Sequence, residues 1–202
     1  MKITTIRQQV KRVERYSIFV DGVYSFSLSD REVVASGIHK GLELSEKEVR
    51  KYKKLSEVDK VYGLALNLIA HRARSQKELT DYLRRKKLDE SEIQKILNKL
   101  SKGKLVDDWE FARRWVQNRR ELKNASNRKL RLELRVKGIN SEIIDDVLAD
   151  SIDEESKALK ELIEKKLRQT KYLNDPQKLM TYLTRQGFNY QDIKTALDTK
   201  TY

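Results

Sequence analysis

The sequence predicts a mainly α-helical protein with a small N-terminal β-hairpin module, and three observations lead to this prediction. Strand-like segments occur only near the N-terminus, helical spacing of apolar residues dominates from about residue 56, and one apolar spacing occurs three times. The 202 residues are 38% hydrophobic and 37% charged, with seven glycines and one proline, which is typical of a highly charged, helix-rich globular protein. We expect three tandem three-helix repeats in an elongated array.

The N-terminal module begins with strand signals. Residues 15–20 (RYSIFV) and 23–28 (VYSFSL) are rich in β-branched and aromatic residues, and Asp21 and Gly22 between them form a strong two-residue hairpin turn. Residues 2–7 are a candidate third strand. A hairpin alone is only marginally stable, so this module must pack against a neighbour.

Helix-capping residues follow the hairpin. Ser29 is placed to cap a short helix through Ala35, and Ser45 with Glu48 has the spacing of a capping box that opens a longer helix. We expect an interruption of that longer helix near Leu55.

The internal repeat is the clearest signal in the chain. Each copy reads as a helix of about 12 residues, a turn at Lys87, Gly138 or Gly187, and a second helix, with another amphipathic segment before it (61–73, 108–122 and 155–168). The predicted domains are therefore 1–55, 56–106, 107–153 and 154–202. The repeated apolar positions are Leu79, Leu83, Leu88, Ile93 and Leu97; Leu130, Leu134, Ile139, Ile144 and Leu148; and Leu179, Leu183, Phe188, Ile193 and Leu197.

Positive charge is concentrated in the middle of the chain. The net charge is +13, and residues 72–137 alone hold 21 Lys/Arg and 10 Asp/Glu, a net charge of +11. A charge so localised indicates an anionic partner, either a phosphate backbone or an acidic protein surface. Aligned through the leucines, the cations Lys77 and Arg128 correspond to the neutral Gln177, so the third repeat is expected to contribute shape or apolar contact.

Helical spacing assigns faces to the basic segments. On the helix that starts at the capping pair Asp107 and Asp108, the spacing places Phe111, Trp115 and Leu122 inward and Arg113, Gln117 and Arg120 on the opposite face. On the next helix Leu130 and Leu134 face inward. Trp109 is a candidate base-stacking platform, whereas Trp115 is expected in the core. The candidate partner-binding or DNA-binding residues are Arg72, Arg74, Lys77, Arg84, Arg85, Lys86, Arg113, Arg114, Arg120, Arg128, Arg131, Arg135 and Lys137.

Several classes of chemistry lack the residues they need. The chain has no cysteine, which removes disulfides and thiolate sites, and no glycine-rich phosphate loop followed by Lys-Ser/Thr. His39 and His71 are far apart in the sequence. We therefore expect no catalytic site, metal or cofactor. Because neither a signal peptide nor an apolar run long enough to span a membrane is present, a cytoplasmic protein is expected.

Four segments carry a family resemblance. The runs RARSQKEL (72–79), KLVDDWEFA (104–112), LRLELRVKGI (130–139) and YLTRQGF (182–188), in this order, resemble the RecX family of bacterial recombination regulators over about residues 60–200, except that Lys87 replaces the turn glycine of the first repeat. The resemblance implies a regulator acting in recombination, DNA repair and the SOS response. Such a protein binds the RecA filament in its helical groove, modulates ATP hydrolysis and strand exchange, usually by inhibition, and binds single- or double-stranded DNA more weakly. We expect a monomer.

Two other function classes stay open. A helix, glycine turn and helix also resemble a helix-turn-helix, but the segments in the recognition position, 89–97 and 141–150, have acidic starts that DNA phosphates would repel. A non-sequence-specific DNA-binding protein is therefore the alternative function. A purely structural helical adaptor is a third, and it predicts associations that do not respond to salt.

Overall fold

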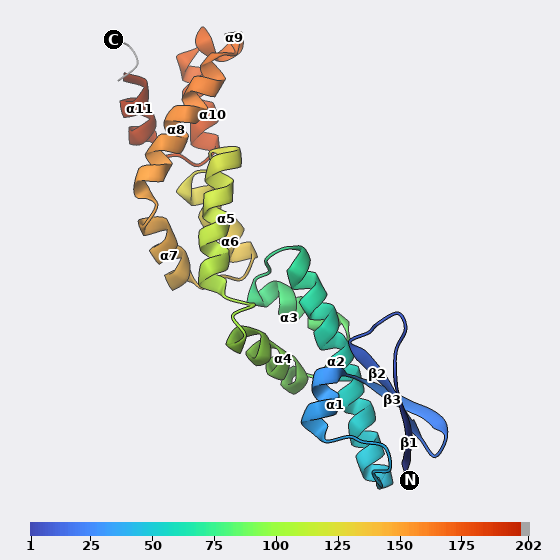
Figure 1. Ribbon diagram of the computed structural model, residues 1–202. Coiled ribbons are helices and arrows are strands. Elements are labelled where there is room, and N and C mark those ends of the chain that lie inside the picture. Colours follow the sequence, from blue (N-terminus) through green and yellow to red (C-terminus); the bar gives the residue numbers. More distant parts are fainter. Residues whose placement is uncertain (199–202) are drawn as a thin grey trace. The chain divides into compact units, whose positions relative to one another are not determined.

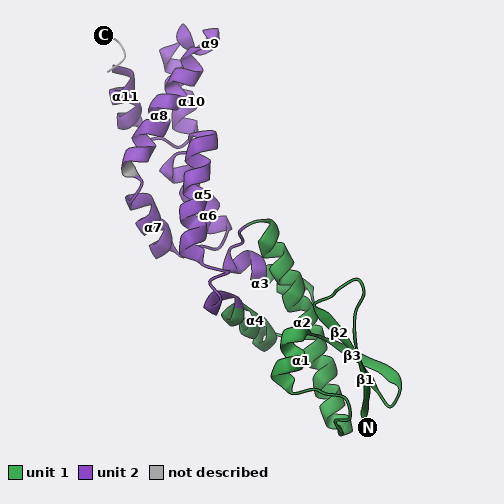
Figure 2. Cartoon of the chain, in the orientation of Figure 1, with its two compact units in different colours: residues 1–72, 80–99 green, residues 73–79, 100–202 purple. Residues whose placement is uncertain are grey.

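The computed structural model describes residues 1–198, which form a mainly α-helical chain with a three-stranded antiparallel sheet at its N-terminus (Figure 1). The chain divides into two compact units, which Figure 2 shows in different colours: unit 1 contains residues 1–72 and 80–99, and unit 2 contains residues 73–79 and 100–198. The predicted fold class is confirmed. No helix in this described part is long and apolar enough to cross a membrane.

The sheet has the order β1-β2-β3, with β1 (Ile3–Gln8), β2 (Arg15–Val20) and β3 (Val23–Ser29). Asp21 and Gly22 both have positive φ, 49° and 84°, as a tight hairpin turn that follows the strand twist requires. The third strand expected near residues 2–7 is present as β1. Figure 1 shows α1 (Asp30–Ser36) and α2 (Glu46–His71) beside this sheet.

The predicted caps form, but the predicted interruption does not. Ser45 and Glu48 make a reciprocal capping box, and α2 then runs without a break through Leu55. The sheet supports this part of α2, because Ser56 Oγ donates to the Ser27 carbonyl at 2.5 Å and Asp59 pairs with the buried Arg15 at 2.8 Å. These contacts with β2 and β3 keep α2 helical at the point where its polar residues predicted an interruption.

The remaining helices follow the repeat. Of the fifteen repeated apolar positions, thirteen are buried, and Leu88 and Leu197 are half-buried. The short α9 is an addition that the spacing did not predict. These helices are α3 (Gln76–Arg85), α4 (Glu90–Lys102), α5 (Asp108–Lys123), α6 (Asn127–Val136), α7 (Ser141–Ala149), α8 (Ile152–Leu167), α9 (Thr170–Leu173), α10 (Pro176–Arg185) and α11 (Tyr190–Asp198).

All three repeats use the same left-handed turn. The φ values are 62° at Lys87, 78° at Gly138 and 94° at Gly187, so the lysine of the first repeat does not change the turn. Glycine is needed at the other two positions for a further reason. A Cβ atom on Gly138 would lie 2.3 Å from Lys77 Cδ, and one on Gly187 would lie 2.7 Å from Ser126 Oγ.

Within unit 2, consecutive repeats meet through one set of contacts that occurs twice. At the first joint (residues 75–78 with 108 and 137–138), Ser75 Oγ donates to the Lys137 carbonyl at 2.7 Å. The Gln76 amide donates to Asp108 at 2.8 Å. Ser75 is fully buried and also caps α3 by accepting from the Glu78 amide at 3.2 Å.

The second joint (residues 126–129 with 155 and 186–187) repeats these contacts one unit later. Ser126 Oγ donates to the Gln186 carbonyl at 2.7 Å, and the Asn127 amide donates to Glu155 at 2.7 Å. Arg128 packs beside Gly187 as Lys77 packs beside Gly138. The third repeat has Asp175, Pro176 and Gln177 at these aligned positions. It therefore lacks the hydroxyl, the amide hydrogen and the cation from which a joint is made.

Candidate functional site

The candidate cations are divided between the two units. Arg72, Arg84, Arg85 and Lys86 belong to unit 1, and the other nine belong to unit 2. Nine of the thirteen are exposed, three are half-buried, and one is buried. Most of the predicted set is therefore accessible to an anionic partner. The three half-buried residues are Arg74, Arg131 and Lys137, and the buried one is Arg120.

Several exposed cations already face carboxylates on the same or the following helix. Arg113 and Arg114 both bind Glu110, at 2.9 and 2.7 Å, and these hydrogen bonds lower the pKa of Glu110 to about 2. Arg84 binds Glu90 at 2.8 Å, which raises the pKa of the guanidinium. Such exposed pairs contribute little stability, but each partly cancels the positive potential at its position.

Trp115 lies at the centre of a polar cluster and is not available for base stacking. Its ring packs against the unit 2 core, and its indole N–H donates to Glu133 at 2.8 Å. Arg119 and Lys137 each lie 5.0 Å from the ring centroid, and Lys137 also pairs with Glu78 at 2.6 Å. The cation–π contacts and the ion pair give Lys137 a structural role at the first joint.

Arg120 and Leu122 are corrections to the predicted faces of α5. Arg120 is only 6% exposed and donates to the Ala125 carbonyl and the Asn127 side chain, whereas Leu122 is 71% exposed. Burial lowers the pKa of Arg120. The loop after α5 turns back over the helix, and its carbonyl needs a donor that the guanidinium supplies. The buried face of α5 therefore includes Ala112, Val116 and Arg120, which follow one another at intervals of four residues.

Trp109, the other candidate stacking residue, is 42% exposed. It lines a cleft of about 420 Å³ between α5 and α8 together with Arg113 and Ser151. Carboxylates such as Glu154 also line this cleft, so its charge is mixed. The cleft does not carry the uniform positive charge that a phosphate backbone favours.

The acidic pair before α5 has a structural role. Asp107 caps the helix by accepting from the Trp109 and Glu110 amides, and Asp108 accepts from Gln76 at the first joint. Desolvation raises the pKa of Asp108. Among the described residues no cluster of His, Asp or Glu could hold a metal ion.

Comparison with known proteins places these features in a family. Residues 1–45 match the regulatory protein RecX N-terminal domain, residues 62–100 the first RecX three-helix domain, and residues 107–148 the second. The regulatory protein RecX of Listeria monocytogenes serotype 4a (strain HCC23) is 34% identical over 200 residues, covering 97% of this chain and 74% of that protein. The chain belongs to the RecX family.

The chain is also similar to other RecX proteins, both in sequence and in structure. The regulatory protein RecX of Bacillus subtilis (strain 168) is 31% identical over 204 residues, covering 99% of this chain and 77% of the relative. A crystal structure of regulatory protein RecX has a TM-score of 0.81 and 28% identity, covering 98% of both chains. That of RecX from Lactobacillus salivarius has a TM-score of 0.65 and 28% identity, covering 71% of this chain and 96% of the other. As a member of this family, the protein is a regulator and not an enzyme.

Two cations near the predicted set were missed by the sequence reading. Lys129 and Arg185 line a cleft at the second joint together with Arg128. Lys129 follows Arg128 directly in a basic helix, but Arg185 lies in the third repeat, which was expected to contribute shape or apolar contact. The signal was present in the aligned positions, where Lys129 and Arg185 replace Glu78 and Val136.

Proposed function

We propose that this protein regulates homologous recombination by binding the RecA filament in its helical groove and inhibiting ATP hydrolysis and strand exchange. Weaker binding to single- or double-stranded DNA is a secondary activity. The observation that carries this proposal is the similarity to regulatory RecX proteins along 97% of the chain. The net charge of +11 on residues 72–137 supports an anionic partner such as a nucleoprotein filament.

The exposed members of the candidate set supply the contacts in this proposal. Arg85, Arg128 and Arg135 are exposed, and none of them pairs with a carboxylate in the part of the chain that the structure describes. Their full charge is available to a partner. Arg120 is left out of the contact surface because its guanidinium is buried.

The helix-turn-helix alternative is disfavoured by the charges on its recognition helices. α4 begins with Glu90, which binds Arg84, and Asp145 of α7 binds Arg131. These carboxylates tie each helix to the one before it and would repel phosphates on both sides of a major groove. Backbone contact without base reading fits the basic surface better.

The test is a titration of the protein into RecA assembled on single-stranded DNA, with ATP hydrolysis as the readout. Regulation of the filament predicts inhibition at amounts well below one molecule per RecA protomer. A protein that only competes for DNA would inhibit near saturation of the DNA, and inhibition that is relieved by excess free oligonucleotide would support the DNA-binding alternative instead.

A further inference from the structure

The second joint contains a cleft whose charged lining is entirely positive. The cleft has a volume of about 500 Å³ and lies between the start of α6 and the end of α10. Arg128, Lys129 and Arg185 contribute its cations, and Thr184 and Gln186 add uncharged polar groups. Within the part of the chain that the structure describes, no acidic residue lines this cleft.

The first joint shows what this cleft lacks. Its residues aligned with Lys129 and Gln186 are Glu78 and Lys137, which pair across the joint at 2.6 Å. Leu132 likewise replaces Asp81. The second joint therefore keeps the hydrogen bonds of the first, including the one from its helix amide to a carboxylate, here Glu155, but has no counterpart of Glu78 or Asp81. Within the residues described, Arg128, Lys129 and Arg185 form no ion pair.

The position of two of these cations is unfavourable for the helix itself. Arg128 and Lys129 lie in the first turn of α6, and that turn contains no acidic residue. The positive end of the helix dipole disfavours cations at this position, whereas α3 places Glu78 there. The Asn127 amide at this helix end already donates to Glu155, so an anion in the cleft would interact favourably with the two cationic side chains.

We infer that this cleft binds the phosphodiester backbone of a single-stranded nucleic acid. Arginine, lysine, threonine and glutamine are among the side chains that contact phosphate oxygens in protein–nucleic acid complexes. Leu132 at the cleft is 57% exposed and offers an apolar contact to a sugar or base. A flexible single strand can follow a concave surface, which a stiff duplex does less readily. The inference specifies a site for the DNA binding in the proposed function, and its biological role depends on that function.

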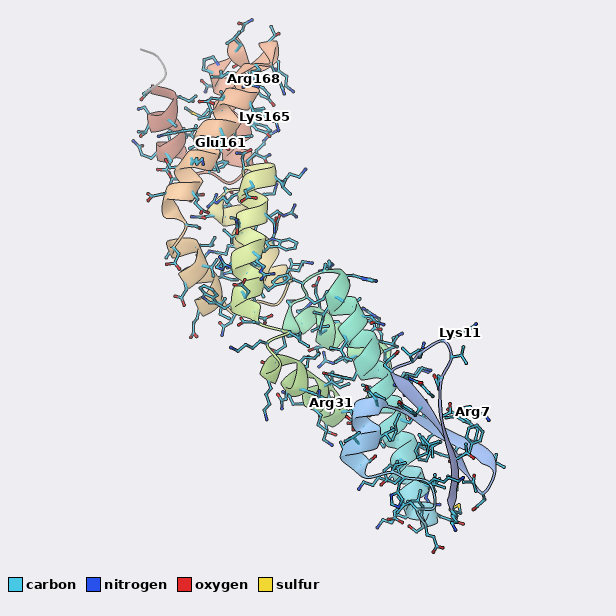
Figure 3. All side chains as sticks on the ribbon, viewed as in Figure 1. Arg7, Lys11, Arg31, Glu161, Lys165 and Arg168 are labelled. Carbon is cyan, nitrogen blue, oxygen red and sulfur yellow. The ribbon has the colours of Figure 1, made fainter. Side chains whose placement is uncertain are left out.

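Three variants of equal net charge test the site. Arg185→Gln removes one cation, and Lys129→Glu with Gln186→Lys recreates the ion pair of the first joint. Lys165→Gln is the control, since it lies on exposed α8 surface outside the cleft (Figure 3). Each variant lowers the net charge by one, so a difference between them reports position and not overall charge.

Binding to fluorescein-labelled oligo(dT) is measured by anisotropy over a series of salt concentrations, with circular dichroism as the folding control. For Arg185→Gln and the double variant we expect affinity to fall by about fivefold or more at low salt. We also expect the salt slope to decrease by about 0.7 for each phosphate that the variant no longer neutralises. Lys165→Gln should stay close to wild type.

Affinities and salt slopes equal to those of Lys165→Gln would overturn the inference. Unchanged oligonucleotide binding with loss of RecA-filament binding would overturn it as well, because the cleft would then accept acidic protein side chains. If wild type does not alter RecA ATP hydrolysis but the cleft variants still lose oligonucleotide affinity, the proposed function fails and the nucleic-acid site stands.

Discussion

At the first joint of unit 2, Lys137 of one repeat reaches back to Glu78 of the repeat before it, whereas the aligned residues of the second joint are Gln186 and Lys129. The serine hydroxyl, the N-terminal amide and the turn glycine keep the same roles at both joints. These contacts occur at both joints and are what consecutive repeats use in order to pack. The charges at the positions of Glu78 and Lys137 differ between the joints, so these positions can serve either stability, as at the first joint, or binding, as proposed for the second.

The largest expected effect comes from the turn glycines. Gly138→Ala and Gly187→Ala should each destabilise unit 2 by about 2–4 kcal/mol, because the new Cβ atom both occupies a left-handed position and meets the preceding repeat. The destabilisation should be greater at Gly138, where the closest approach is 2.3 Å. Both tryptophans lie in unit 2, so urea unfolding followed by tryptophan fluorescence reports on this unit.

Lys87→Gly is the matched control for these variants. Lys87 has the same turn conformation with a side chain in place, so glycine should leave stability unchanged or raise it by about 1 kcal/mol, as seen by circular dichroism. If Gly138→Ala destabilises by no more than Lys87→Gly stabilises, the left-handed backbone alone accounts for the effect, and contact between repeats is not what makes glycine necessary.

The second-largest expected effect comes from the serines at the two joints. Ser75→Ala and Ser126→Ala each remove a helix cap and leave a carbonyl of the next repeat without its donor, which should lower the free energy of unfolding by about 1.5–3 kcal/mol. Asp175→Ala removes only the aligned cap of α10 and should cost about 1 kcal/mol. If the three variants unfold at the same urea concentration, the bonds between repeats contribute nothing measurable.

The charges of the joints can be compared directly. Lys137→Met removes the pair with Glu78 and the contact with the Trp115 ring, and should cost about 1 kcal/mol, less at high salt because screening weakens the ion pair in the wild type. Gln186→Met at the aligned position should change stability by about 0.5 kcal/mol or less. A salt-independent destabilisation by Lys137→Met would assign its effect to packing alone.

Much of the fold was accessible from the sequence because its signals are local or periodic. The Asp21-Gly22 turn, the capping box at Ser45 and the repeated leucines all agree with the structure. The continuity of α2 past Leu55 could not be predicted, since it is supported by contacts with strand residues that lie 29 and 44 positions earlier in the chain.

The site was harder to predict, because knowing that a residue is an arginine or a lysine does not tell whether its side chain is exposed to solvent. Arg120 and Arg128 are both arginines in a basic segment, yet the first is buried under its own loop and the second is exposed. The sequence shows which positions of the repeats correspond. This alignment places Lys129 at the position that Glu78 has in the first repeat, and so it could have identified the change of charge. That the serine, the glycine and these charges meet at one joint follows only from the packing of repeat on repeat.

The smallest expected effect concerns the carboxylate of the first joint. Burial raises the pKa of Asp108, so the folded protein holds this proton more tightly than the unfolded chain does. Protonation therefore stabilises the fold as the pH falls toward the unfolded value of 3.8, and the charged form is unfavourable at neutral pH. Asp108→Asn keeps an oxygen for the Gln76 amide without the charge, and should raise stability at pH 7 by about 0.5 kcal/mol or less. In urea unfolding across this pH range, the advantage over wild type should disappear below the unfolded pKa, where both side chains are neutral.

Asp108→Ala is the control for this variant. Because alanine has no acceptor for the Gln76 amide, Asp108→Ala should be less stable than Asp108→Asn at every pH. An advantage of Asp108→Asn over wild type that grows as the pH falls would contradict the burial of this charge.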